Sequence, residues 1–372
     1  MKTLNIMLKP ASSLCNMKCK YCFYADVASS RCTTSYGIMT EDTAESIIGS
    51  IYSELEPQDR VHFAFQGGEP TLAGLPFFRH FVTVASARED ITVSFALQTN
   101  GLALDEEWCE FLKENNFLVG LSLDILPEIH DSARIDNQGK STYKRVSDTL
   151  SLLRKSGVAF NVLCTLTNAV ARHPRQVWNQ LVKLEIDFVQ FTPCLGDFGS
   201  TEKSPYTLTP QRFSDFYTQL FHCWFEDYKK DKRRSVKLFD DIVNLMVLGR
   251  PTNCGMNGIC TPQLVVEADG STYPCDFYCL DEYCMGNIAS EPISKLLDST
   301  QVKNFLNRQH KQPKLCADCK YRIFCGGGCK RMQKEMCCDI NDNFCGYKTF
   351  LDQCGGELHR LAQQIRQQYF SK

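Results

Sequence analysis

The chain has 372 residues, of which 43% are hydrophobic, and a formal net charge of -2. Because this length exceeds the size at which one hydrophobic core usually stops growing, we expect a main domain with an appendage. The near-neutral charge argues against a nucleic-acid partner held by phosphate contacts. No apolar run reaches the roughly 20 residues of a membrane span, and the apolar start is too short for a signal peptide. We therefore predict a cytoplasmic protein without membrane contact.

Short β-forming runs alternate with amphipathic helical segments over the first 200 residues. We predict strands at residues 4–8, 61–65, 91–97, 118–123, 160–166 and 188–191. The clearest helical segments are residues 40–55, 105–114 and 142–155. This alternation indicates a parallel sheet, either a partial or full barrel or an open doubly wound sheet. In all of these folds, functional groups collect at the carboxyl ends of the strands.

Polar or glycine-rich clusters follow the first four predicted strands. They are Cys15–Cys22, Gln66–Pro70, Gln98–Gly101 and Ser122–Asp124. Each one alone is typical of an ordinary loop. Since all four follow successive parallel strands, we expect them to meet at one edge of the sheet.

The pattern changes after Thr209. Two helices are predicted at residues 209–228 and 238–248, and a loop-rich segment with many cysteines begins near Pro251. Asp269-Gly270 lies between β-forming residues and predicts a tight hairpin turn. Two further helices are expected at residues 301–308 and 358–369.

The 21 cysteines are unevenly distributed along the chain. Three lie between residues 15 and 22, and twelve lie between residues 254 and 345. In a reducing compartment, such clusters bind metals or act in catalysis more often than they form disulfides. We therefore predict two separate metal-binding regions.

The first of these regions has the spacing C-x3-C-x2-C, from Cys15 through Cys19 to Cys22. A structural zinc ion and a [4Fe-4S] cluster both take four protein ligands. This run supplies three, and only Cys32 is near in sequence as a fourth. A [4Fe-4S] cluster here would keep one iron open to a substrate or cosubstrate.

With Tyr21 before its third cysteine, this run resembles the signature of the radical S-adenosylmethionine (SAM) superfamily. The resemblance implies that SAM binds the open iron. It also implies that Gly67-Gly68-Glu69 is the motif that meets the methionine amino group. Further SAM contacts are implied at the positions that match the family, which are Tyr21, Ser122, Arg134 and Leu195.

The second region resembles the SPASM extension of radical SAM enzymes that modify peptides. That resemblance implies two further [4Fe-4S] clusters, and so three in all. The first auxiliary cluster would be held by Cys254, Cys260, Cys275 and Cys329, and the second by Cys316, Cys319, Cys325 and Cys345. The spacing of these cysteines is also typical of two zinc sites. No partner is assigned to Cys279, Cys284, Cys337 and Cys338.

Longer segments, among them residues 9–13, 63–74 and 273–278, resemble the anaerobic sulfatase-maturating enzymes. This resemblance implies oxidation of a cysteine or serine side chain on a sulfatase to Cα-formylglycine. The implied fold class is α/β, a partial (β/α)6 TIM-like barrel followed by a small cysteine-rich α+β SPASM domain. The implied borders are residues 1–235 for the barrel, 236–345 for the SPASM domain and 346–372 for a C-terminal helix.

The implied partners are a nascent or unfolded sulfatase and an electron donor. The sulfatase would present a Cys/Ser-x-Pro/Ala-x-Arg segment, and the donor would be a low-potential protein such as flavodoxin or ferredoxin. We expect the chain to act as a monomer.

In the implied reaction, one-electron cleavage of SAM yields a 5′-deoxyadenosyl radical, which takes a hydrogen atom from the substrate Cβ. A proton and a second electron must then leave. Asp276 occupies the position of the family's proton acceptor, and burial against an apolar wall would make it a stronger base. Tyr24 would orient the substrate.

One segment departs from the family pattern. Where these enzymes commonly have Ser-Met-Asp-Gly, this chain has Ser122-Leu-Asp-Ile125, followed by Leu126. The change removes a glycine that reaches positive φ easily and adds bulk. We expect this turn to alter the fit of the substrate beside the SAM site.

Two other functions compete with this one. The same machinery forms thioether or carbon–carbon crosslinks in ribosomally made peptides, often with an N-terminal leader-binding extension, for which a chain with its cysteine motif at Cys15 has no room. The other alternative is a non-catalytic, zinc-binding interaction module. Iron content separates the two classes, because three clusters bring about twelve irons per chain and a zinc module brings none.

Overall fold

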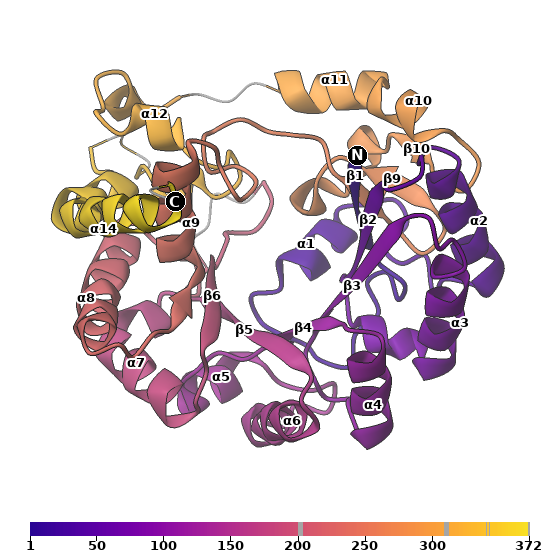
Figure 1. Ribbon diagram of the computed structural model, residues 1–372, viewed down its shortest axis with the longest axis horizontal. Helices are drawn as coiled ribbons and strands as arrows, with labels where there is room; N and C mark the ends of the chain where they lie inside the picture. Colours follow the sequence, from indigo (N-terminus) through magenta and orange to yellow (C-terminus); the bar gives the residue numbers. More distant parts are fainter. Residues whose placement is uncertain (200–203, 309–311, 340, 342, 371–372) are drawn as a thin grey trace. The chain divides into compact units, whose positions relative to one another are not determined.

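The computed structural model describes residues 1–199, 204–308, 312–339, 341 and 343–370. The chain forms two compact units. The first comprises residues 1–123, 131–160 and 262–308, and the second comprises residues 124–130, 161–261 and 309–372. Figure 1 shows that both units combine strands with helices.

The strands of the first unit form a mostly parallel sheet (Figure 1). They are β1 (Thr3–Leu8), β2 (Arg60–Phe65), β3 (Thr92–Thr99), β4 (Leu118–Ser122), β8 (Leu264–Val266), β9 (Ser271–Tyr273) and β10 (Gly286–Asn287). Their order is β10-β9-β8-β1-β2-β3-β4. Strands β8, β1, β2, β3 and β4 pair in parallel, whereas β9 pairs antiparallel with β8 and β10. The predicted strands and the predicted hairpin at Asp269-Gly270 are confirmed.

The helices of the first unit differ in how they begin, and only some of them start at a capping side chain. They are α1 (Phe23–Ser29), α2 (Glu41–Tyr52), α3 (Leu75–Ala85), α4 (Glu106–Glu114), α6 (Tyr143–Ser156), α10 (Ile293–Leu297) and α11 (Thr300–Asn307). Thr40 caps α2 by accepting from the Thr43 amide, and Asp105 caps α4 by accepting from the Trp108 amide. Helix α6 ends at Gly157, whose φ of 71° is in the left-handed region that favours glycine.

The second unit contains three further parallel strands. They are β5 (Ala159–Leu166), β6 (Phe188–Pro193) and β7 (Ser235–Val236), in the order β5-β6-β7. Its helices are α7 (Pro174–Lys183), α8 (Pro210–Lys229), α9 (Lys237–Leu248), α12 (Arg322–Cys325), α13 (Gln333–Met336) and α14 (Gly346–Phe370), while α5 (Pro127–Ala133) spans the border of the two units. Among the described strands, β10 and β7 end the strand order, so the sheet is open. A partial barrel is therefore confirmed.

The last helix is longer than its apolar periodicity predicts, and it begins at residue 346, where the resemblance implies a C-terminal helix. The sequence predicts a helix from residue 358, but α14 begins at Gly346. Gly355 and Gly356 lie inside it, and glycines in a helix interior weaken the sequence signal. Packing outweighs that cost, because Phe350 and Leu358 are fully buried and α14 contacts α8 and α9 (Figure 1).

The hairpin of the cysteine-rich region joins the sheet of the first unit. Strand β8 pairs in parallel with β1, so Ile6 lies between Phe63 and Leu264. The predicted domain borders after residues 235 and 345 were drawn by resemblance and stay a prediction. Within the described part of the chain, no helix combines the length and apolar character needed to cross a membrane.

Candidate active site and cysteine clusters

The four polar clusters of the first unit meet at the carboxyl edge of its strands. The Gly68 amide donates to the Ser12 carbonyl at 2.8 Å, and the Glu69 amide donates to the Leu14 carbonyl at 2.8 Å. Between the ends of β3 and β4, Gln98 Nε2 donates to Ser122 Oγ at 2.9 Å. The expected common edge is confirmed.

Packing requires glycine at position 68. A Cβ atom there would lie 2.1 Å from the Leu14 carbonyl oxygen, which no side chain tolerates. The loop that leads to Cys15 therefore lies directly on the backbone of residues 67–69. Glycine in this motif shapes the cysteine loop as well as permitting close approach of a ligand.

Glu69 is enclosed by donors from two loops. Its carboxylate accepts hydrogen bonds from the amide and hydroxyl of Thr71, the hydroxyl of Thr99 and the amide of Asn100, and the residue is 1% exposed. Burial raises the pKa of Glu69, and these donors oppose the shift. Because its oxygens are engaged in this way, Glu69 fixes the ends of β2 and β3 relative to each other.

The three cysteines of the C-x3-C-x2-C run lie on the loop between β1 and α1. Cys22 is exposed and directly precedes α1, and Cys15 and Cys19 are half-buried. The Cys15 sulfur accepts from the Met17 amide at 3.4 Å and from Asn100 Nδ2 at 3.8 Å. Burial raises the pKa of Cys15 to about 12, so this thiol keeps its proton until a metal ion displaces it. A thiol-rich loop of this kind fits an iron–sulfur cluster.

Two predicted SAM contacts lie beside the same loop. Its backbone runs along residues 133–136, since the Lys18 amide donates to the Ile135 carbonyl at 2.8 Å. Arg134 Nη1 is 4.0 Å from the Cys19 sulfur, and its guanidinium lies 5.5 Å from the centre of the Tyr21 ring. The structure thus brings Tyr21 and Arg134 together. Leu195, a further predicted contact, is buried in the second unit.

Asp276 follows β9 in the first unit and faces polar groups. Lys9 Nζ lies 2.5 Å from Oδ1, and Gln66 Nε2 donates to Oδ2 at 2.7 Å. The expected apolar wall is therefore wrong, because a cation and an amide hold the two carboxylate oxygens. Gln66 follows β2, so Asp276 lies at the same edge of the sheet as the cysteine loop.

A second buried carboxylate, Glu267, was not predicted. It is 0% exposed and accepts hydrogen bonds from Ser12 Oγ at 2.9 Å, from Arg31 Nη1 at 2.7 Å and from the Tyr24 hydroxyl. Burial raises the pKa of Tyr24 well above its ordinary value, so the phenol keeps its proton and donates it to Glu267. Tyr24 itself is 2% exposed. Glu267 and its acidic hairpin neighbour Asp269 look alike in sequence, and only the long-range pairing of β8 with β1 singles Glu267 out.

The predicted ligands of the first auxiliary cluster are divided between the units. Cys254, Cys260 and Cys329 belong to the second unit, and Cys275 belongs to the first. In the second unit, a Cβ atom on Gly255 would lie 2.7 Å from Cys329 Cβ, so the Cys254 turn packs directly against Cys329. The chemistry of this sulfur donor set suits an iron–sulfur cluster.

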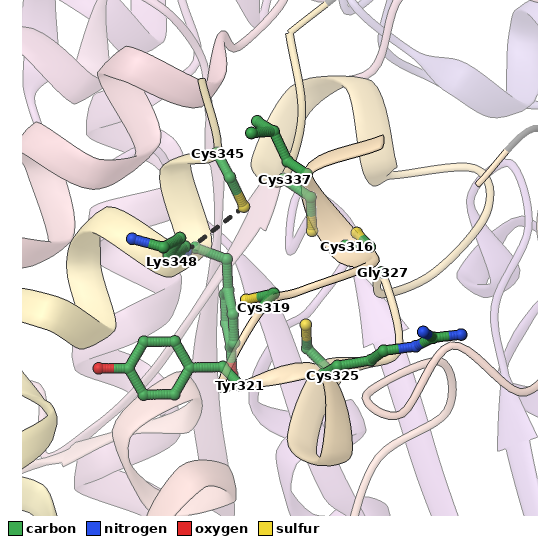
Figure 2. A pocket seen from close by; sticks show the side chains of 11 residues that line it. Cys316, Cys319, Tyr321, Cys325, Gly327, Cys337, Cys345 and Lys348 are labelled. Carbon is green, nitrogen blue, oxygen red and sulfur yellow. Dashed lines mark hydrogen bonds between the residues drawn. The ribbon is translucent and has the colours of Figure 1, made fainter. Parts of the chain in front are cut away.

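The predicted ligands of the second auxiliary cluster line one pocket in the second unit. Figure 2 shows the sulfurs of Cys316, Cys319, Cys325 and Cys345 directed into the space between them, with a fifth sulfur, that of Cys337, on the same side. Burial raises the pKa of Cys325 to about 11, whereas a hydrogen bond from Cys338 lowers the pKa of Cys345. Sequence spacing pointed to four of these thiols and missed Cys337.

Zinc was the alternative for these cysteines. Within the described ranges, no three histidine, cysteine, aspartate or glutamate side chains are placed to bind one metal ion together.

The unusual turn after β4 places an apolar side chain in the core. Ile125 is 0% exposed. Among the described residues, positive φ values occur at glycines and at five others, none of which is Ile125. The turn therefore forms without the conformation that glycine would provide, and its effect on the fit of the substrate stays a prediction.

Two family models match the chain. Residues 10–171 match the radical SAM superfamily, and residues 258–320 match the iron–sulfur cluster-binding SPASM domain. A radical SAM domain uses SAM with a [4Fe-4S] cluster, and a SPASM domain binds further iron–sulfur clusters. The zinc-module alternative is thereby overturned.

Individual relatives match over nearly the whole chain. The chain is 37% identical to a cysteine-type anaerobic sulfatase-maturating enzyme of Clostridium novyi, covering 98% of this chain and 99% of that one. It is 28% identical to a serine-type enzyme of Bacteroides thetaiotaomicron, covering 89% and 83%. The solved structure of native anSMEcpe with bound AdoMet and Cp18Cys peptide superposes with a TM-score of 0.88 at 37% identity, covering 98% and 99%. The chain therefore belongs to the family of anaerobic sulfatase-maturating enzymes, and it is a radical SAM oxidoreductase.

Proposed function

We propose that the chain oxidises a cysteine side chain of a sulfatase to Cα-formylglycine. Identity supports cysteine over serine, since the cysteine-type relative is 37% identical and the serine-type relative 28%. The observation that carries the proposal is the placement of Asp276, whose two oxygens are held by Lys9 and Gln66 at the edge that also carries the cysteine loop. A fixed carboxylate suits a step that removes a proton from the substrate.

The cofactors would occupy the cysteine sites described above. We assign one [4Fe-4S] cluster to Cys15, Cys19 and Cys22, and two more to the two sets of four cysteines given above. When bound, SAM and these clusters supply a hydrogen-abstracting 5′-deoxyadenosyl radical and a route for the second electron. The proposed SAM contacts are Tyr21, Gly67, Gly68, Glu69, Ser122, Arg134 and Leu195.

These residues would divide the work of binding SAM. Because the Glu69 carboxylate is buried and already accepts from Thr71, Thr99 and Asn100, the acceptor for the methionine amino group would be a backbone carbonyl of Gly67 or Gly68. Arg134, already beside Tyr21, would bind the carboxylate or ribose of SAM as a fixed cation.

Asp276 and Tyr24 would act on the peptide. After a hydrogen atom is taken from the substrate Cβ, the thiol proton passes to the Asp276 carboxylate and one electron leaves. The product is a thioaldehyde, which water converts to the aldehyde with release of hydrogen sulfide. Tyr24 would hold the substrate through its ring, since its hydroxyl is engaged by Glu267.

The partners follow from this chemistry. The substrate would be a nascent or unfolded sulfatase with a Cys-x-Pro-x-Arg segment, because a folded core would not present that side chain. A low-potential donor such as flavodoxin or ferredoxin would supply electrons to a monomeric enzyme. We infer a cytoplasmic location, since 21 cysteines are best kept as thiols in a reducing compartment.

The test is an anaerobic incubation with SAM, a reductant and a peptide that carries the Cys-x-Pro-x-Arg core. Mass spectrometry should show CH2SH replaced by CHO, together with 5′-deoxyadenosine. The matched Ser-x-Pro-x-Arg peptide should react more slowly. An unmodified peptide with SAM consumed would overturn the proposal, and an internally crosslinked peptide would establish the alternative activity.

A further inference from the structure

A fully buried lysine lies against the proposed proton acceptor. Lys9 comes directly after β1 and is 0% exposed, and its Nζ atom is 2.5 Å from Oδ1 of Asp276. Lysine is almost never fully buried unless it is paired. Lys9 therefore places a buried positive charge at the carboxyl edge of the sheet, which also carries the cysteine loop.

The backbone directs Lys9 to this place. Its amide donates to the Val266 carbonyl at 2.8 Å, which ties the end of β1 to β8. A Cβ atom on Gly67 would lie 3.1 Å from both Cβ and Cγ of Lys9, so the missing side chain at position 67 leaves room for the lysine stem. The stem therefore passes between the glycine motif and the cysteine-rich hairpin.

A second buried ion pair lies beside the first. Arg31 Nη1 is 2.7 Å from Glu267 Oε1, and both side chains are fully buried. The Tyr24 ring connects the two pairs, because Lys9 Nζ lies 3.6 Å from its centre while its hydroxyl donates to Glu267. Burial opposes the charge on Lys9, but Asp276 and Glu267 outweigh it and raise the pKa of Lys9. The lysine thus stays a cation.

We propose that Lys9 is a positioning residue for the oxidation, which holds the Asp276 carboxylate in the one orientation that accepts the substrate proton. Lys9 fixes Oδ1 and Gln66 fixes Oδ2, so the carboxylate plane is set by two contacts. Each oxygen keeps a further lone pair for a proton. The inference rests on the proposed function, because it gives Asp276 the role of proton acceptor.

Lys9 also places Tyr24. An ammonium over the ring face and a carboxylate at the hydroxyl hold the phenol at both ends. The proposed substrate-side residue and the proposed acceptor are thereby fixed relative to each other through one cation. If Lys9 only stabilised the fold, its loss would lower the amount of folded enzyme. It would leave unchanged the amount of product formed per SAM cleaved.

The test compares Lys9→Met, Asp276→Asn and the double variant. Methionine keeps most of the lysine stem and removes the charge. We expect Asp276→Asn to lower formylglycine formed per 5′-deoxyadenosine by about 100-fold or more, since a positioned proton acceptor contributes about 10²–10⁴-fold. Lys9→Met should lower the same ratio by about 10-fold to 100-fold, as a misplaced group does. SAM cleavage should persist in both.

The double variant decides whether Lys9 acts through Asp276. If it does, adding Lys9→Met to Asp276→Asn should lower the ratio much less than Lys9→Met lowers it alone, because only the placement of Tyr24 is then left to lose. This variant also controls for folding, because it removes both charges of the pair and leaves neither buried alone. Its melting temperature and iron content should therefore match or exceed those of Lys9→Met.

Three results would overturn the inference or its premise separately. A wild-type ratio in Lys9→Met overturns the role of Lys9, as does a double variant that falls as far below Asp276→Asn as Lys9→Met falls below the wild type. If Lys9→Met loses iron or unfolds, the comparison of the double variant with Asp276→Asn still decides. A wild-type enzyme that makes no formylglycine overturns the proposed function itself, before Lys9 is considered.

Discussion

The two described cysteine sites differ in how they offer sulfur. The loop of Cys15, Cys19 and Cys22 is one continuous segment, ends at an exposed thiol and offers three thiols. The pocket between Cys316 and Cys345 draws on separate turns and presents five sulfurs, most of them buried (Figure 2). In the proposed assignment, the incomplete set would keep an iron available for chemistry, whereas the surplus set would close its cluster to other ligands. The number of thiols would then mark which site reacts and which one passes electrons.

The largest expected effect is the loss of one ligand from the incomplete set. Cys19→Ala should abolish SAM cleavage and remove about four of about twelve irons per chain, because two thiols do not hold a cubane. Iron analysis and release of 5′-deoxyadenosine measure both changes.

Cys32→Ala is the matched control for that variant. Cys32 is the nearest other cysteine in sequence, but it is exposed and its amide donates to Asp281 at 2.8 Å. Iron content and SAM cleavage should match the wild type. An equal loss in Cys32→Ala would break the comparison, since the first site would then hold four ligands.

The next largest effect is expected from the loss of one thiol in the pocket between Cys316 and Cys345. Cys345→Ala should lose about four irons per chain, because the proposed cubane needs this thiol. SAM cleavage with a chemical reductant should persist, since the cysteine loop is intact, while formylglycine falls strongly. If Cys345→Ala lost as much SAM cleavage as Cys19→Ala, then SAM cleavage would depend on both sites and not on the cysteine loop alone.

Much of this arrangement follows from local sequence. The helical segments that begin at Thr40 and Asp105 and the four polar clusters after successive strands are short-range signals, and the structure confirms them. Glu267 and Lys9 were missed because their importance arises from the pairing of β8 with β1, across more than half the chain. Periodicity alone missed the early start of α14, which the resemblance implied, because packing on α8 and α9 overrides two interior glycines.

A smaller effect is expected from the glycine that supports the cysteine loop. Gly68→Ala places a Cβ atom 2.1 Å from the Leu14 carbonyl and should push the loop away. We expect a stability loss of about 1–3 kcal/mol, as for other overpacked positions, with weaker SAM binding. Thermal melting and SAM titration measure these changes.

Gly49→Ala is the control, because a Cβ atom there meets nothing within 4 Å and the residue lies inside α2. It should leave SAM binding unchanged and stabilise slightly, since alanine favours a helix. If Gly68→Ala also bound SAM as the wild type does, the cysteine loop would not depend on this glycine for its shape.

The smallest effect is expected from Cys337→Ala, and it tests which four of the five thiols in the pocket bind the cluster. Cys337 is 4% exposed and its sulfur shares the pocket of the four proposed ligands, yet a cubane takes only four thiolates. If Cys337 is the spare, Cys337→Ala keeps full iron content and costs no more than about 1 kcal/mol for the atom removed. Cys345→Ala is its matched partner, since both side chains line the same space (Figure 2). The reverse result, iron lost in Cys337→Ala and kept in Cys345→Ala, would move the ligand assignment to Cys337. It would also show that spacing in sequence selected the wrong fourth thiol.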